Sequence, residues 1–319
     1  THLHNRRCPP AMTQRESFLA APGPQSATSE PAPFALALND ALPTPVLLAV
    51  PHAGRNYPPP LLDAMRNPEF SAIRLEDRLV DVLARDVAAQ TGASLLVAHA
   101  PRAMIDLNRA VDDMDWGMVA EGRPDGTKHS AGNRRARGGL GLVPRRLNGL
   151  GEVWKGRLGR EEVERRIATV HEPYHQTLKS ALDRIRSRWG AALLIDLHSM
   201  PPLRQRHPAD RPAHFVVGDR FGASCDGMLS AAAMRFFGRE NRRAGHNRPY
   251  AGGYVLDRHG SPALGIHAMQ IEVCRSLYLT RDHQAPNDKV GEIADLLSRL
   301  VRTLAEEVTP ERRFPQAAE

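Results

Sequence analysis

The sequence has few of the residues that several common classes of protein depend on. Its 319 residues include three cysteines, too few for a disulfide framework, and no two of them are spaced as in a thiolate zinc site. Aromatic residues make up 5%, which offers little surface for stacking bases. No apolar run approaches the ~20 residues that span a bilayer. We therefore expect a cytoplasmic globular protein with no nucleic-acid partner and no membrane partner.

Two widespread catalytic motifs are also missing, the phosphate-binding P-loop and the serine-hydrolase elbow. The composition is otherwise ordinary, with 41% hydrophobic and 25% charged residues. The chain has a net charge of +7, and residues 123–166 alone account for +7. Three interpretations of that segment stay open: a solvated loop, a cationic rim that attracts an anionic substrate, and an RNA-binding surface.

The apolar pattern predicts strands that alternate with helices. Buried strands are expected where short apolar runs occur, at residues 46–50, 94–98, 103–107, 191–197 and 214–218, and the alternating pattern of residues 268–273 predicts one more strand. Helical spacing is found at residues 75–90, 161–188, 222–238 and 288–307. Pro173 is expected to kink or split the second of these helices and so to keep His171 from sharing a face with His175.

This order of elements is typical of an α/β fold, a three-layer sandwich around a mostly parallel central sheet. Residues 1–44 are rich in Pro, Ala, Ser and Gln without periodicity, and we expect them to form a disordered arm. Residues 45–319 are then one α/β domain, with a basic insertion near residues 121–160.

Polar side chains stand at the ends of the predicted strands. His52 follows the first strand, His198 follows residues 191–197, and Glu272 lies inside an apolar strand. Because burying such groups is costly, they predict a site, and two histidines with a carboxylate are typical ligands of catalytic zinc. The carboxylate is expected from Glu76 or Asp77. The alternative is two histidines that only hydrogen-bond the strand ends.

Nine segments, in order along the chain, resemble the N-formylglutamate amidohydrolase family, which comprises N-formylglutamate deformylases and their relatives. They are residues 51–58, 76–81, 102–109, 139–144, 173–175, 196–201, 217–220, 247–254 and 270–278. The resemblance implies a phosphorylase/hydrolase-like sandwich related to the zinc carboxypeptidases. It also implies that the chain is a metal-dependent enzyme that hydrolyses a linear amide C–N bond.

The resemblance further implies roles for individual residues. His52 and His198 match metal-site histidines, and Asp77 is preferred to Glu76 as the third ligand of one zinc ion. Glu272 matches the position of a general acid/base.

Four more residues are expected to act on the substrate. Arg102 matches an arginine that polarises the scissile carbonyl in related deacylases. Asn108 and Arg109 match a motif that holds a substrate carboxylate, and Arg275 is expected to hold a second one.

The reaction implied is the hydrolysis of N-formylglutamate to formate and glutamate, a step of histidine degradation. The expected partner is therefore a small anionic N-acyl amino acid. Two alternatives stay open. One is a related metallohydrolase that acts on another N-acyl amino acid or a peptide-like amide. The other is a non-catalytic binding protein on the same fold, which would bind no metal and hydrolyse nothing.

Overall fold

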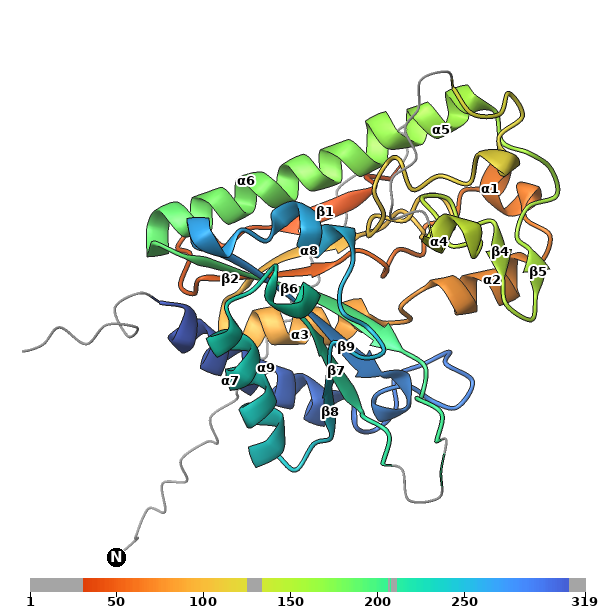
Figure 1. Cartoon of the computed structure of the whole chain (residues 1–319). Helices are drawn as coiled ribbons and strands as arrows, with labels where there is room; N and C mark the ends of the chain where they lie inside the picture. Colours follow the sequence, from red (N-terminus) through yellow and green to blue (C-terminus); the bar gives the residue numbers. More distant parts are fainter. Residues whose placement is uncertain (1–30, 125–133, 206, 208–210, 310–319) are drawn as a thin grey trace, which may run out of the picture. The chain divides into compact units, whose positions relative to one another are not determined.

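A mixed sheet of seven strands organises the computed structural model of the chain, which describes residues 31–124, 134–205, 207 and 211–309 (Figure 1). Across the sheet the strands are β1 (Phe34–Ala37), β3 (Ser94–Ala98), β2 (Val46–Val50), β6 (Ala192–Met200), β9 (Ile266–Cys274), β7 (Phe215–Gly218) and β8 (Ala244–His246). β3, β2, β6 and β9 are parallel. β1 pairs antiparallel with β3, and β7 pairs antiparallel with β9. The edge strand β8 pairs parallel with β7, so the sheet is mixed but mostly parallel.

The central strands are buried along their whole length. Every residue of β2, β6 and β9 is buried, which explains why β2 is continuously apolar. β9 alternates in sequence as predicted, yet its polar residues Gln270 and Glu272 are buried as well. The strand prediction at 191–197 is confirmed, and β6 continues through His198 to Met200. Since parallel strands end at the same edge, the polar residues at the ends of β2, β6 and β9 are brought together.

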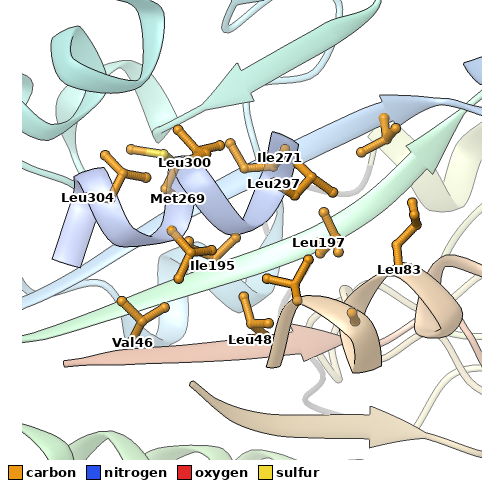
Figure 2. Close-up of a cluster of buried hydrophobic side chains, with 14 of the residues drawn as sticks. Val46, Leu48, Leu83, Ile195, Leu197, Met269, Ile271, Leu297, Leu300 and Leu304 are labelled. Atoms are coloured by element: carbon orange, nitrogen blue, oxygen red, sulfur yellow. The ribbon is translucent and has the colours of Figure 1, made fainter. Parts of the chain in front are cut away.

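Helices cover both faces of the sheet and confirm the three-layer α/β sandwich. One core cluster joins the sheet to α3 (Val80–Thr91), α7 (Gly227–Arg239) and α9 (Val290–Val308). A second cluster, on the other face, joins it to α6 (Glu172–Trp189) and α8 (Tyr254–His259). Figure 2 shows part of the first cluster, where Leu297 and Leu300 of α9 lie near Ile271 of β9. Burial of each such side chain contributes about 1.5–3 kcal/mol.

The helix predicted at 161–188 is one continuous rod with an irregular turn. It consists of α5 (Arg160–Arg166), a π-helical turn η2 (Ile167–His171) and α6. The wide turn ends two residues before Pro173, which has no N–H to donate to the preceding turn. The proline therefore changes the winding of the helix without splitting it.

Shorter elements connect these layers. The short α-helices are α1 (Pro59–Ala64), α2 (Pro68–Leu75) and α4 (Arg134–Arg137). The 3₁₀ helices are η1 (Trp116–Met118), η3 (Arg220–Gly222), η4 (Pro262–Leu264) and η5 (Arg275–Leu277). The strands β4 (Arg146–Leu147) and β5 (Gly151–Glu152) form a hairpin. The hairpin and α4 belong to the segment predicted as a basic insertion, of which residues 125–133 lie outside the described residues.

Two of the predictions are wrong. The first concerns the disordered arm expected over residues 1–44. This segment includes β1, which pairs with β3 from Phe34 to Ala37, so the folded part begins before residue 45. Residues 1–30 lie outside the described residues.

The second concerns the strand expected at 103–107, which is a loop. Its apolar residues are buried, but the N–H of Asp106 donates to the carbonyl of Leu142 and joins no sheet.

Among the described helices, none is both long enough and apolar enough to span a membrane.

Candidate active site

A cavity of about 260 Å³ opens at the carboxyl ends of β2, β6 and β9. All the residues that the sequence proposed for a site line this one cavity: His52, Asp77, Arg102, Asn108, Arg109, His198, Glu272 and Arg275. They come from both halves of the chain, and the parallel centre of the sheet brings them to one place.

Two imidazoles and one carboxylate form the floor of the cavity. His52 follows β2, His198 lies in β6, and Asp77 precedes α3. The Nδ1 atoms of His198 and His52 lie 2.9 Å and 3.6 Å from the Asp77 Oδ2 atom, and the two ring centres are 4.8 Å apart. The three side chains are buried and offer ligand atoms that all lie within 4.8 Å of one another.

Each imidazole is held from behind by a second carboxylate. His52 Nε2 lies 2.7 Å from Asp106 Oδ1, and His198 Nε2 lies 2.8 Å from Asp196 Oδ2. Because an ionised carboxylate only accepts hydrogen bonds, both Nε2 atoms carry a hydrogen, and both Nδ1 atoms face Asp77. Histidine ligands of metals are usually oriented in this way, so the donor set fits a divalent cation.

The same arrangement shifts the ionisation of the site. Burial opposes the charged form of His198, but Asp196 and Asp77 raise its pKa well above the usual value. Burial also opposes the charge of Asp77, yet hydrogen bonds from His198 and His52 hold its pKa below the usual range. For Asp106, the nearby Arg102 and His52 outweigh burial and lower the pKa. Asp77 is thus held in its ionised form, in which it can serve as a ligand of a cation.

Glu272 lies beside this group on β9, opposite His198 in the sheet register. Its Oε1 accepts a hydrogen bond of 2.8 Å from Gln270 Nε2. Burial raises the pKa of Glu272, and the Asp77 charge adds to that effect against the opposing charge of His198. Such a carboxyl group can both accept and donate a proton near neutral pH.

The loop after β3 supplies the next three residues, and Asp106 organises it. Arg102 Nε donates to Asp106 Oδ2 at 2.8 Å, and the Asn108 backbone N–H donates to Asp106 Oδ1 at 2.8 Å. Asn108 Oδ1 accepts from the backbone N–H of Val255 at 2.9 Å. A Cβ at Gly253 would lie 2.5 Å from that Asn108 oxygen, so a glycine is needed there. The loop is therefore fixed from both sides.

Arg275 does not have the freedom that the sequence suggested. Its Nε donates to Ser199 Oγ, its Nη1 to the carbonyl of Ile73, and its Nη2 to the carbonyl of Glu76 and to Asp77 Oδ1. These bonds use four of the five N–H groups of a guanidinium. The geometry makes Arg275 a support for Asp77, so we do not retain it as a receptor for a second carboxylate.

Three buried histidines behind the Asn108 loop were missed. His175 Nε2 lies 3.0 Å from the carbonyl of Leu107, and His171 Nε2 lies 2.8 Å from the carbonyl of Arg109. His175 Nδ1 lies 2.9 Å from His259 Nε2, 84 residues away in sequence. A carbonyl only accepts, so His175 donates through Nε2, accepts at Nδ1 and is neutral.

The predicted separation of His171 from His175 is wrong, since their ring centres are 4.5 Å apart. The wide turn η2 aligns them in spite of Pro173. Residues 171–175 read His-Glu-x-x-His, the spacing of a zinc-protease helix. Here Glu172 is exposed and both histidines are turned toward backbone carbonyls, so the motif does not build a metal site.

Ten further residues line the cavity, and four of them have long polar side chains: Arg74, Arg135, Tyr250 and Gln270. Arg135 belongs to the basic segment, and its position favours the interpretation of that segment as a cationic rim. Gln270 and Tyr250 lie within segments of the family resemblance, which was the available signal.

Comparison with known proteins now adds to this geometry. The sequence model of the N-formylglutamate amidohydrolase family matches residues 44–279. The chain belongs to this family. An N-formylglutamate deformylase of Pseudomonas aeruginosa is 30% identical over 266 residues, covering 82% of this chain and 91% of that protein. One from Pseudomonas putida is 32% identical over 244 residues, covering 74% of this chain and 82% of that protein.

Solved structures agree with the N-formylglutamate amidohydrolase assignment. The crystal structure of an N-formylglutamate amidohydrolase from Ralstonia eutropha has a TM-score of 0.77 and 32% identity, covering 88% of this chain and 99% of that one. A gene product of Agrobacterium tumefaciens has a TM-score of 0.61 at 18% identity, covering 87% and 96% of the two chains, and shares the fold. The prediction of a family of linear-amide hydrolases is thereby confirmed.

Proposed function

We propose that the chain hydrolyses the formyl amide of N-formylglutamate to formate and glutamate, using one divalent cation held by His52, Asp77 and His198. The observation that carries the proposal is that these three groups and Glu272 converge in one cavity of a chain from this family. The choice of N-formylglutamate as the substrate is supported by the two relatives that are named N-formylglutamate deformylases.

The donor set favours zinc. Two imidazole nitrogens and one carboxylate oxygen are typical ligands of catalytic zinc, and imidazole suits that ion better than it suits magnesium or calcium. A zinc ion bound there supplies a Lewis acid for the substrate carbonyl and acidifies water. Asp106 and Asp196 keep the two histidines in the required tautomer and orientation.

Glu272 transfers the proton in this proposal. It takes a proton from the attacking water and later gives it to the nitrogen of the leaving glutamate. Gln270 Nε2 holds Oε1 at 2.8 Å, which orients the carboxylate and leaves Oε2 for the proton. Burial favours the protonated intermediate form of Glu272, which eases the second transfer.

Arginines position the substrate and stabilise the charge that develops on it. Arg102 uses Nε on Asp106, and its terminal nitrogens remain to donate to the oxyanion. Arg109 uses Nε on the carbonyl of Leu140 and Nη1 on that of Asn108, and its Nη2 remains to bind the α-carboxylate. The Asn108 Nδ2 atom lies 3.5 Å from His198 Nε2, so the amide group of Asn108 lies beside the metal-binding histidine of this proposal.

Glu272→Gln tests the role of the base. We expect the variant to retain bound zinc but to release formate from N-formylglutamate at least about 100-fold more slowly, because proton transfer by a positioned group contributes about that much or more. Bound metal is measured on the purified protein, and formate release is measured before and after chelation. Glu292→Gln, an exposed residue of α9 paired with Arg242, is the matched control.

Normal turnover by Glu272→Gln would show that another group is the base. His198→Ala should lose both the metal and the activity. If it keeps the metal, the ligand assignment is wrong, and if the wild-type chain releases no formate, the substrate is wrong.

A further inference from the structure

Five arginines line the cavity, more than one small substrate can use: Arg74, Arg102, Arg109, Arg135 and Arg275. N-formylglutamate has two carboxylates, so two guanidinium groups are required in addition to the one that faces the formyl oxygen. A guanidinium has five N–H groups, and those already given to the protein are not available to a ligand. The hydrogen bonds of each arginine therefore indicate which of them can bind the second carboxylate.

Four of these arginines each give at least one N–H group to the protein. Arg275 gives four N–H groups to the protein, as described above. Arg109 gives two groups to carbonyls and Arg102 gives Nε to Asp106. Arg74, at the end of α2, donates from Nη2 to the carbonyl of Asn148 at 2.9 Å.

Arg135 is the exception. Within the described part of the chain, its guanidinium makes no hydrogen bond or ion pair, although it lines the cavity. Its exposed position means that the charge costs little to maintain without a partner. All five of its N–H groups are thus available to a ligand.

The backbone around Arg135 places it beside Arg109. The Arg135 carbonyl accepts from the backbone N–H of Leu140 at 2.9 Å, and the Leu140 carbonyl accepts from Arg109 Nε at 2.9 Å. Ala136, the next residue of α4, is buried and packs near Gly141, which anchors the short helix. Burial lowers the pKa of Arg109, and the charges of Arg102 and Arg135 add to this against Asp106, which is consistent with their proximity.

This proximity matches the shape of the substrate. Only the Cα–Cβ–Cγ chain separates the two carboxylates of glutamate, so the receptor for the second must lie close to the receptor for the first. We propose that Arg135 binds the side-chain carboxylate of the substrate and thereby selects N-formyl amino acids with an acidic side chain. The proposal rests on the proposed function, and it assigns to Arg135 the role that was predicted for Arg275.

Two substrates that differ only in the side-chain charge test this inference. We measure kcat/KM for formate release from N-formylglutamate and from N-formylglutamine, using the wild-type chain, Arg135→Gln and Arg135→Lys. Arg135→Gln should lose about 10–100-fold on N-formylglutamate and change little on N-formylglutamine, because only the first offers a charged acceptor. Arg135→Lys should recover part of the loss, since it keeps the charge but not the planar fork.

Arg137→Gln is the matched control, because Arg137 is exposed on the same helix and does not line the cavity. An equal loss on both substrates with Arg135→Gln, or an unchanged ratio between them, would overturn the inference while leaving the proposed function intact. The same is true if Arg74→Gln, and not Arg135→Gln, alters the ratio. A wild-type chain that is active on neither substrate would overturn the proposed function as well.

Discussion

Two pairs of neighbouring histidines contact the loop that contains Asn108, and the two pairs differ in the groups around them. His52 and His198, with ring centres 4.8 Å apart, have a carboxylate within 4 Å of each ring nitrogen. His171 and His175 have ring centres 4.5 Å apart, and both turn Nε2 toward a backbone carbonyl. The residue type and the burial are the same in both pairs, while the nearest acceptors are not.

The acceptors decide the ionisation. Carboxylates raise the pKa of His198 in spite of its burial. Burial, together with neighbouring positive charges, lowers the pKa of His175 to about 2 and that of His259 to about 3. Carboxylates at both nitrogens of a buried imidazole favour a positive charge there, either a proton or a metal ion. A buried imidazole between a carbonyl and another imidazole stays neutral and serves as a structural support.

Asp77→Asn should produce the largest change in this comparison. It removes the carboxylate that faces both Nδ1 atoms, so we expect the loss of bound metal and of formate release. The loss should exceed the roughly 10–100-fold that removal of an outer hydrogen-bond partner costs. Glu76→Gln is the matched control, because Glu76 pairs with Arg78 at 2.8 Å instead of facing the cavity. If Glu76→Gln loses the metal and Asp77→Asn keeps it, Glu76 and not Asp77 is the carboxylate ligand.

Asp196→Asn should have a smaller effect on the same pair. The amide keeps the shape of the side chain but removes the charge behind His198, so metal affinity should fall by about 10–100-fold. Competition with a chelator of known affinity measures the change. Asp183→Asn, at a half-exposed residue of α6 paired with Lys179, should leave the affinity unaltered. An unaltered affinity in Asp196→Asn would mean that this carboxylate does not orient the ligand.

The neutral histidines should appear in the pH dependence of stability. Their pKa values are lower in the folded chain than the unfolded value of about 6.5, so the unfolded state binds more protons below that pH. Stability from these groups is complete above about pH 6.5 and is lost as the pH falls toward 3. Between pH 7.5 and 5.0, each histidine should cost about 1–2 kcal/mol of unfolding free energy.

Urea unfolding at several pH values measures this loss. His259→Gln should reduce this dependence of stability on pH by the contribution of one histidine. An identical dependence in wild type and His259→Gln would mean that the histidines behind the loop are not held neutral.

Much of the site was accessible from the sequence because polar residues at the ends of apolar strands are expensive to bury. His52, His198 and Glu272 stand out for that reason, and the parallel centre of the sheet brings them together. Glu76 and Asp77 could not be distinguished in this way, since they are adjacent and both are buried. Only the path of the chain before α3 turns Asp77 toward the cavity and Glu76 toward Arg78.

Contacts between segments that are distant in sequence explain the predictions that were wrong. β1 is four residues long and only half buried, so its pattern is weak without β3 beside it. The loop at 103–107 is as apolar as a strand, yet its N–H groups bond to the insertion and to Pro101. The contact between His175 and His259, which are 84 residues apart, joins two helices, and the apolar pattern of either helix does not indicate that they meet.

The sequence by itself determined the layers and the chemistry, because apolar runs, helical periodicity and the cost of buried polar groups are properties of local segments. The tertiary structure decided which side chains still have donors or acceptors to offer, since each hydrogen bond across the fold removes one. Arg275 and Arg135 carry the same side chain and line the same cavity. Arg275 is bonded to Ser199, Ile73, Glu76 and Asp77, whereas Arg135 makes no hydrogen bond or ion pair with the residues that the structure describes.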